Sequence, residues 1–196
     1  MGKDEFLKPE KVTVSDKILA ATVLKLFPAR VPPNHLTIFR FFTVPFVLFL
    51  IVQHEYFWGI LLFAISAFTD ALDGAMARTR NQITEWGKIY DPLADKLLIG
   101  LTALIIIPKH FGFFLVFAIL FIEMVLIGAA YYVKNRTTKQ IQANGWGKTK
   151  MMLQSFGVGL LLANAVFRIP LIYSLSEIFI YASLIFAVIS LITYGI

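Results

Sequence analysis

Four aspartates stand between two long apolar runs of the sequence: Asp70, Asp73, Asp91 and Asp95. Ionised carboxylates are costly at membrane depth, so acidic residues in such a place usually face a cavity, an ion or a substrate path. Carboxylate oxygens are hard ligands that suit Mg²⁺, Mn²⁺ or Ca²⁺. A pair of ions shared between carboxylates suits chemistry on phosphate or phosphoanhydride groups. The spacing therefore indicates metal-assisted attack at a pyrophosphate, in or against a membrane.

The first aspartate pair falls on one face of a predicted helix. A helical period of about 100° per residue puts four residues in one sector: Asp70, Asp73, Gly74 and Ala77. The two small residues leave room for a ligand to approach the backbone. Arg78 lies beside this sector, and its guanidinium offers a fork for phosphate oxygens.

The second pair forms a stripe on the following helix, because Gly87, Asp91 and Asp95 are spaced by four residues. Pro92 predicts either a helix that begins close to Asp91 or a kink. A short polar turn joins the two helices, so we expect antiparallel neighbours whose carboxylates converge. Converging carboxylates repel one another unless cations lie between them. A pair of helices whose acids merely form salt bridges is disfavoured, because no matching set of cations lies in the same stretch.

Composition defines the class of protein that must position these residues. The chain has 196 residues, of which 58% are hydrophobic, 15% are charged and none is cysteine. A water-soluble domain of this size would carry more charge, so we predict an all-α membrane protein without disulfides or thiolate chemistry. The length suffices for six spans of ~20 residues. We expect them near residues 36–53, 57–77, 85–107, 111–133, 149–167 and 172–194.

The N-terminal residues 1–34 are predicted to form a segment separate from a membrane domain at residues 35–196. Within the segment, apolar residues recur at helical spacing from Val14 to Leu26, which favours an amphipathic helix on the membrane surface. Ser15 or Thr13 can cap this helix. The alternative is a disordered basic tail.

Lysines and arginines predict the orientation of the spans. One side gathers the N-terminal segment, the turn with Arg78, Arg80 and Lys88, and the loop 134–150, whereas Lys109 and Arg168 lie on the other. We expect the basic side to be cytoplasmic, in the cell's inner membrane, with both termini and the aspartates on that side. Topology and anionic lipids account for the basic loops, so nucleic acid is not an expected partner.

The pattern Asp70-x-x-Asp73-Gly74-x-x-Ala77-Arg78, followed by Gly87-x-x-x-Asp91-x-x-x-Asp95, resembles the signature of the CDP-alcohol phosphotransferases. The resemblance implies a CDP-diacylglycerol donor, an alcohol acceptor, CMP as leaving group, two Mg²⁺ or Mn²⁺ ions and a homodimer. It makes all four aspartates metal ligands, and Asp91 and Asp95 catalytic. Asp95 either completes the second metal site or accepts the proton of the attacking hydroxyl. Gly74, Ala77 and Arg78 would hold the CDP part.

Two further segments are similar to phosphatidylglycerophosphate synthases of this family. One is the entry to the first span, where Asn34 and Thr37 would line the nucleotide site and Arg40 would bind the acceptor. The other is the start of the fifth span, with the pattern Ala143-Asn144-x-x-Gly147-Lys148-x-Lys150-x-x-x-Gln154. The loop before the fifth span and the start of that span carry four basic residues. We expect them to hold the phosphate of glycerol 3-phosphate: Lys134, Arg136, Lys148 and Lys150.

One departure leaves the acceptor open. Those synthases commonly carry an Arg-Glu pair in the fourth span, where this chain has Ile122 and Glu123. Glycerol 3-phosphate is the favoured acceptor. Phosphatidylglycerol, as in cardiolipin synthases, inositol phosphate and serine are alternatives. Outside the family, a divalent-cation transporter would need acids along a path across several spans, whereas these acids cluster at one edge.

Overall fold

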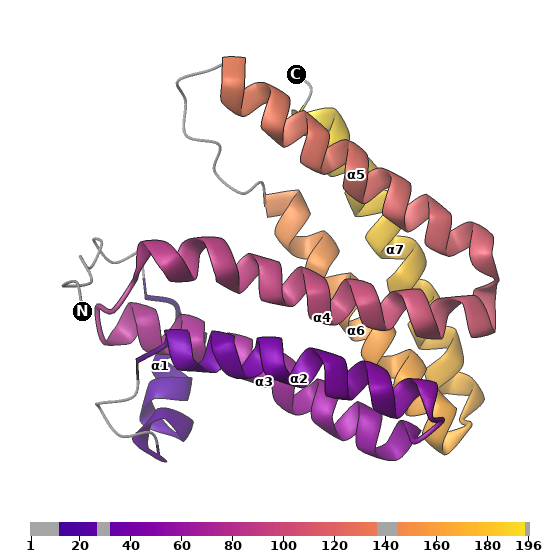
Figure 1. Ribbon diagram of the computed structural model, residues 1–196, viewed down its shortest axis with the longest axis horizontal. Coiled ribbons are helices and arrows are strands. Elements are labelled where there is room, and N and C mark those ends of the chain that lie inside the picture. The colour runs from indigo at the N-terminus through magenta and orange to yellow at the C-terminus, as the bar shows by residue number, and fades with distance from the viewer. Residues whose placement is uncertain (1–11, 27–31, 137–144, 195–196) are drawn as a thin grey trace. The chain divides into compact units, whose positions relative to one another are not determined.

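A computed structural model describes residues 12–26, 32–136 and 145–194. These residues form helices and no strand, which confirms the predicted all-α class. The elements are α1 (Val14–Ala21), the 3₁₀ helix η1 (Val23–Leu26), α2 (Asn34–Val52), α3 (Tyr56–Thr79), α4 (Glu85–Phe111), α5 (Phe113–Arg136), α6 (Gly145–Phe167) and α7 (Pro170–Tyr194) (Figure 1). The chain divides into two compact units, Met1–Leu101 and Thr102–Ile196.

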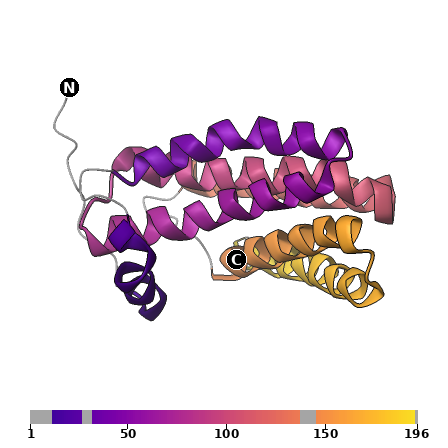
Figure 2. The same cartoon turned by 90° about the horizontal axis from the view of Figure 1, so that it is seen from below.

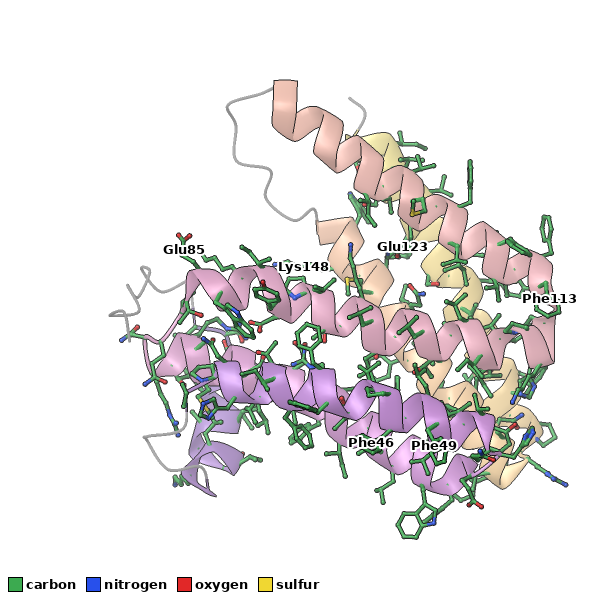
Figure 3. The ribbon with its side chains drawn as sticks, in the orientation of Figure 1. Phe46, Phe49, Glu85, Phe113, Glu123 and Lys148 are labelled. Atoms are coloured by element: carbon green, nitrogen blue, oxygen red, sulfur yellow. The ribbon has the colours of Figure 1, made fainter. Side chains whose placement is uncertain are left out.

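Each of the six long helices overlaps one of the six predicted ranges, with ends that differ by a few residues. Four of them are long and apolar enough to cross a membrane, namely Asn34–Val52, Tyr56–Thr79, Gly145–Phe167 and Pro170–Thr193, and Phe113–Ala129 is a shorter apolar helix. Large apolar side chains lie on the outside, as Phe46 and Phe49 do where they point away from α2 (Figure 3). Exposed phenylalanines on apolar helices suit contact with lipid, as expected of a multi-pass membrane protein.

In the first unit, α2 and α3 pack along each other. Val47, Ile51 and Phe63 are buried, and the hydroxyls of Thr43 and Ser66 share a buried hydrogen bond of 2.7 Å. The bond satisfies two polar groups that would otherwise be costly to bury. These contacts fix the register of α2 against α3, the helix that carries Asp70 and Asp73.

The turn after α3 brings the chain back, so that α4 runs antiparallel to α3 (Figure 1). Asn81 takes the left-handed backbone conformation, with φ of 55°. Thr84 precedes α4, and its hydroxyl oxygen accepts the N–H of Gly87 at 2.9 Å, as an N-capping side chain does. The helix therefore begins at Glu85, ahead of Asp91, and continues through Pro92.

The N-terminal helix α1 is capped by Thr13 rather than Ser15. The Thr13 hydroxyl accepts the N–H of Asp16, whose carboxylate accepts the N–H of Thr13 at 2.8 Å, forming a capping box. The α-helix ends at Ala21, and the chain continues as η1. Leu24 of η1 packs into a buried cluster with Leu36, Leu72, Ala75 and Met76. The predicted helix is thus present in two pieces, with α1 packed on α3.

In the second unit, α7 packs against both α5 and α6, and Figure 2 shows α6 and α7 side by side. The absence of a side chain at Gly157 permits the α6–α7 contact, since a Cβ there would lie 2.7 Å from Ile180 Cγ1 and 3.2 Å from Ile180 N. This is the close helix contact for which glycine is suited. Glu123 of α5 forms an ion pair with Lys150 of α6, so the glutamate of the fourth predicted span is paired.

Candidate active site

A buried arginine lies at the centre of the aspartates. Arg40 of α2 is 0% exposed, and its guanidinium lies 3.0 Å from Asp70, 2.6 Å from Asp73 and 2.6 Å from Asp95. Its Nη1 also donates to the backbone carbonyl of Asp91 at 3.5 Å. The carboxylates of α3 and α4 therefore converge, and they do so around a side chain from a third helix.

The fourth carboxylate, Asp91, is oriented by a hydroxyl. Thr37 is buried one turn before Arg40 on α2, and its Oγ1 donates to Asp91 Oδ1 at 2.5 Å. The cluster has a closed side and an open side, because the side chain of Asp73 is 2% exposed and that of Asp70 is 42% exposed. A ligand approaching from outside would meet Asp70 first.

The charge of the cluster is not balanced by Arg40. Four ionised carboxylates and one guanidinium leave a formal charge of −3 on these five side chains. Hard oxygen donors with surplus negative charge fit divalent cations such as Mg²⁺ or Mn²⁺. Among the described residues, however, no group of three or more His, Cys, Asp or Glu side chains is arranged to hold a metal ion. The guanidinium of Arg40 lies where three of the carboxylates meet.

A pocket of about 140 Å³ opens beside the cluster, where the start of α2, the end of α3 and the start of α4 meet. It is lined by Pro33, Asn34, Gly74, Ala77, Arg78, Gln82, Ile83, Thr84, Gly87, Lys88 and Asp91. Four of the five residues predicted to bind CDP line this pocket: Asn34, Gly74, Ala77 and Arg78. Thr37, the fifth, holds Asp91 instead. Asp91 thus belongs both to the lining of the pocket and to the cluster of four aspartates.

Two glycines leave the space that the polar groups of the pocket occupy. A Cβ at Gly74 would lie 3.1 Å from Arg78 Nη2. A Cβ at Gly87 would lie 3.2 Å from both Asp91 Oδ2 and Thr84 Oγ1, and 3.4 Å from Asn34 Oδ1. At Gly87 these are tight contacts with oxygens, and two of the oxygens are already hydrogen-bonded, since Thr84 Oγ1 donates to Asn34 Oδ1 at 2.9 Å. A side chain at either position would therefore press on polar groups of the site, which would have to shift by a few tenths of an ångström.

We expect Gly87→Ala to lower transferase activity by roughly tenfold, because a shift of about 1 Å in a reacting group can cost ~100-fold and the new methyl displaces Asp91 by less. The matched control is Gly100→Ala in the same helix, where a Cβ would meet nothing within 4 Å. Initial rates of CMP release at saturating substrate would compare the two. Equal rates for both variants would show that the position of Asp91 is not critical.

Arg78 is held by a residue that the sequence did not single out. Its Nε donates to Asp16 Oδ2 at 2.8 Å and its Nη2 to Asp16 Oδ1 at 2.7 Å. Asp16 is 2% exposed. The Arg78 guanidinium holds the pKa of the Asp16 carboxyl well below its usual range, so the pair stays ionised at neutral pH. The available signal was the capping-box spacing of Thr13 and Asp16.

The residues predicted to bind the acceptor are not brought together by the described side chains. Arg40 is enclosed by aspartates, and Lys150 is buried against Glu123. Lys148 is exposed on the first turn of α6 (Figure 3). Lys134 and Arg136 belong to the end of α5, but their side chains lie outside the described part of the chain. The acceptor site stays a prediction.

Comparison with known proteins decides the family. Residues 30–189 match the CDP-alcohol phosphatidyltransferase family. The chain belongs to this family. The recognition made from the aspartate pattern is thereby confirmed, and the matched range contains both the acidic cluster and the pocket. The protein is a membrane-bound transferase of phospholipid biosynthesis, and the family uses divalent cations to act on a CDP-linked lipid and an alcohol.

Several relatives carry the name CDP-diacylglycerol–glycerol-3-phosphate 3-phosphatidyltransferase. The Mycoplasma pneumoniae protein is 32% identical over 161 residues, which are 71% of this chain and 70% of that protein. The Haemophilus influenzae protein is 33% identical over 66% of this chain and 74% of its own length. The Rickettsia typhi protein is 39% identical over 80 residues, 39% of this chain, and the alignment covers only 45% of that relative.

Proposed function

We propose that this protein transfers the phosphatidyl group of CDP-diacylglycerol to glycerol 3-phosphate and releases CMP. The main support is the juxtaposition of the Arg78 pocket with the acidic cluster through Asp91. A nucleotide diphosphate in such a pocket would present its phosphates to the carboxylates. The names of the relatives indicate the acceptor.

Asp70, Asp73, Asp91 and Asp95 would hold two Mg²⁺ or Mn²⁺ ions, which when bound neutralise charge on the pyrophosphate and on the departing CMP. Arg40 keeps three of the carboxylates together, and Thr37 fixes the rotamer of Asp91. Arg78, with Gly74 and Ala77 beside it, would bind the CDP phosphates.

In the reaction, the acceptor hydroxyl oxygen attacks the phosphorus that carries diacylglycerol. The new P–O bond forms as the bond from that phosphorus to the bridging oxygen breaks, and CMP leaves with that oxygen. The hydroxyl proton passes to a carboxylate, for which Asp95 and Asp91 are the candidates. Asp95 is 21% exposed in its side chain, so an acceptor entering from the open side of the cluster can reach it.

The candidates for binding the acceptor phosphate are the predicted basic residues Lys134, Arg136, Lys148 and Lys150. Arg40, the other predicted residue, is fully buried against three aspartates and offers no surface to the acceptor. The departure at Ile122 supports a test of other acceptors, because a missing arginine weakens binding of a phosphorylated alcohol. Phosphatidylglycerol, inositol phosphate and serine are therefore the alternatives.

We also propose the membrane arrangement in full. The helices α2–α7 would be six spans of one membrane domain, residues 35–196, with both termini and the acidic cluster on the cytoplasmic side of the cell's inner membrane. Residues 1–34 would lie on the membrane surface. The apolar side chains of Val14 and Ile18 on α1 support this, since they are 76% and 60% exposed. A homodimer is expected from the family.

The test is an assay of purified protein in detergent with CDP-diacylglycerol, Mg²⁺ or Mn²⁺, and one candidate alcohol at a time. Metal-dependent CMP release with glycerol 3-phosphate alone is the expected result. Release with a different alcohol alone would replace the acceptor and keep the reaction. Absence of release with every acceptor, together with metal flux in proteoliposomes, would favour a transporter.

A further inference from the structure

The contact between Asp16 and Arg78 links the N-terminal helix α1 to the predicted nucleotide pocket. Two nitrogens of the guanidinium donate to the two oxygens of one carboxylate, at 2.8 Å and 2.7 Å. Such a fork fixes the plane of the guanidinium as well as its position. Arg78 is 29% exposed in its side chain, while Asp16 is 3% exposed, so the carboxylate is the fixed partner and the arginine faces the pocket.

Asp16 is itself held in place by independent contacts. Its Oδ2 accepts the backbone N–H of Thr13, and its own N–H donates to the Thr13 hydroxyl. The segment that follows is anchored on α3, since Leu24 is buried and its carbonyl accepts a hydrogen bond from Arg80 Nη2 at 3.2 Å. The carboxylate is therefore positioned by the docking of the whole α1–η1 segment.

The guanidinium of Arg78 also packs closely against Gly74, which has no side chain to displace it. The position of a Cβ on Gly74 lies 3.1 Å from Nη2 and 3.3 Å from Nη1. Without the fork to Asp16, the long arginine side chain would lose the contact that fixes the plane of its guanidinium beside the pocket. We propose that Asp16 is a positioning residue, through which α1 holds the Arg78 guanidinium in place to bind the diphosphate of the CDP-linked donor.

This inference rests on the proposed function, since it takes Arg78 as a donor-binding residue. It adds a role for α1 that is distinct from membrane contact. A preorganised guanidinium loses less rotamer freedom when the phosphates bind, so the effect is on donor affinity. Because Asp16 does not reach the reacting atoms, the rate at saturating donor is left nearly unchanged.

The test begins with Asp16→Asn, which has almost the same volume but turns an amide toward the guanidinium. We expect KM for CDP-diacylglycerol to rise by on the order of tenfold with kcat changed less than twofold, since both effects follow from lost preorganisation of one charged contact. The control is Lys17→Gln, which changes an exposed charged side chain on the same helix. It should raise KM by less than about twofold, because surface changes away from special features usually have small effects.

A double-mutant cycle separates positioning from general support of the fold. Asp16→Asn in an Arg78→Lys background should add little to KM, because both changes remove the same fork. Equal effects of Asp16→Asn in both backgrounds would overturn the inference, since the residue would then act independently of Arg78. A lower KM in Asp16→Asn would also overturn it, because Asp16 would then compete with the donor. If Asp16→Asn does not fold, Asp16→Glu takes its place in the same cycle, with the same outcomes.

Direct binding of CDP-diacylglycerol in lipid nanodiscs, without acceptor, keeps this test separate from that of the proposed function. Donor binding that weakens in Asp16→Asn would support the inference even if glycerol 3-phosphate were the wrong acceptor. Unchanged donor affinity in Asp16→Asn would overturn it even if transfer to glycerol 3-phosphate were observed. Failure of the unaltered protein to bind the donor would contradict the proposed function and the inference together.

Discussion

Asp91→Asn is expected to lower metal-dependent CMP release by on the order of 100- to 1,000-fold, the loss typical when one preorganised electrostatic group is removed from an active site. Asp91 borders the pocket and the cluster at once, and it is the carboxylate that Thr37 orients through Oδ1. The amide keeps the size of the side chain but loses the negative charge. One oxygen can still accept the Thr37 hydroxyl, so the fold is retained.

The matched control for this variant is Glu85→Gln, which makes the same change of charge on the same helix. Glu85 is exposed at the start of α4 and points outward (Figure 3), so its variant should keep activity within about twofold, as surface changes away from special features usually do. Initial rates at saturating donor, acceptor and Mn²⁺ would be compared. A similar loss in both variants would mean that net charge near α4 is responsible. Full activity in Asp91→Asn would remove this residue from the catalytic set.

Much of the architecture follows from simple regularities in the sequence. Apolar runs of about 20 residues separated by polar turns predicted the long helices, because a lipid-facing segment must satisfy its backbone internally. The spacing of Asp70 and Asp73 predicted one shared face, as did that of Asp91 and Asp95. With a short turn between them, convergence of the four carboxylates was the direct consequence.

The partner of these carboxylates was harder to predict. An arginine near the end of an apolar span can snorkel to the interface or turn inward, and residue type alone does not distinguish these. Arg40 turns inward because three aspartates from two other helices surround its guanidinium. The direction of the Arg40 side chain depends on how α2 packs against the α3–α4 pair. The periodicity of residues within one helix carries no information about this packing.

The role of Asp16 was also beyond the reach of local patterns. Asp16 and Arg78 are 62 positions apart in the sequence, so no helical spacing connects them. The capping box predicts where α1 begins, and the apolar residues predict that one side of α1 is covered. The contact itself depends on the place where α1 docks on α3, and that is decided by the burial of Leu24 among Leu72, Ala75 and Met76.

The buried arginine provides a second large effect, on stability. Arg40→Met keeps a long side chain but leaves Asp70, Asp73 and Asp95 without the guanidinium that contacts all three. Removal of one partner from a buried ion pair typically costs ~3–5 kcal/mol, because an uncompensated charge remains buried. We therefore expect the variant in EDTA to unfold about 10 °C below the unaltered protein, given that 1 kcal/mol corresponds to about 2–4 °C in chains of this size.

Divalent ions should reverse much of this loss if the carboxylates bind them. A ligand at 100 times its Kd stabilises the folded state by about 2.7 kcal/mol. Without the guanidinium, the cluster carries a formal charge of −4 rather than −3 and should bind Mn²⁺ more tightly. The melting temperature of Arg40→Met should therefore rise more on addition of Mn²⁺ than that of the unaltered protein. Thermal unfolding in detergent, with EDTA or Mn²⁺, measures both shifts.

Arg168→Met is the control for this experiment, since Arg168 is exposed after α6 and its loss should change the melting temperature by little under either condition. If Arg40→Met and the unaltered protein have the same melting temperature in EDTA, the carboxylates do not need the guanidinium for stability, because they are protonated or well solvated. If it is destabilised but Mn²⁺ gives no larger shift than in the unaltered protein, Arg40 is a structural partner of the aspartates and not a substitute for bound cations. The combination of a large loss in EDTA and a large recovery in Mn²⁺ would show that the same carboxylates bind the arginine and the metal.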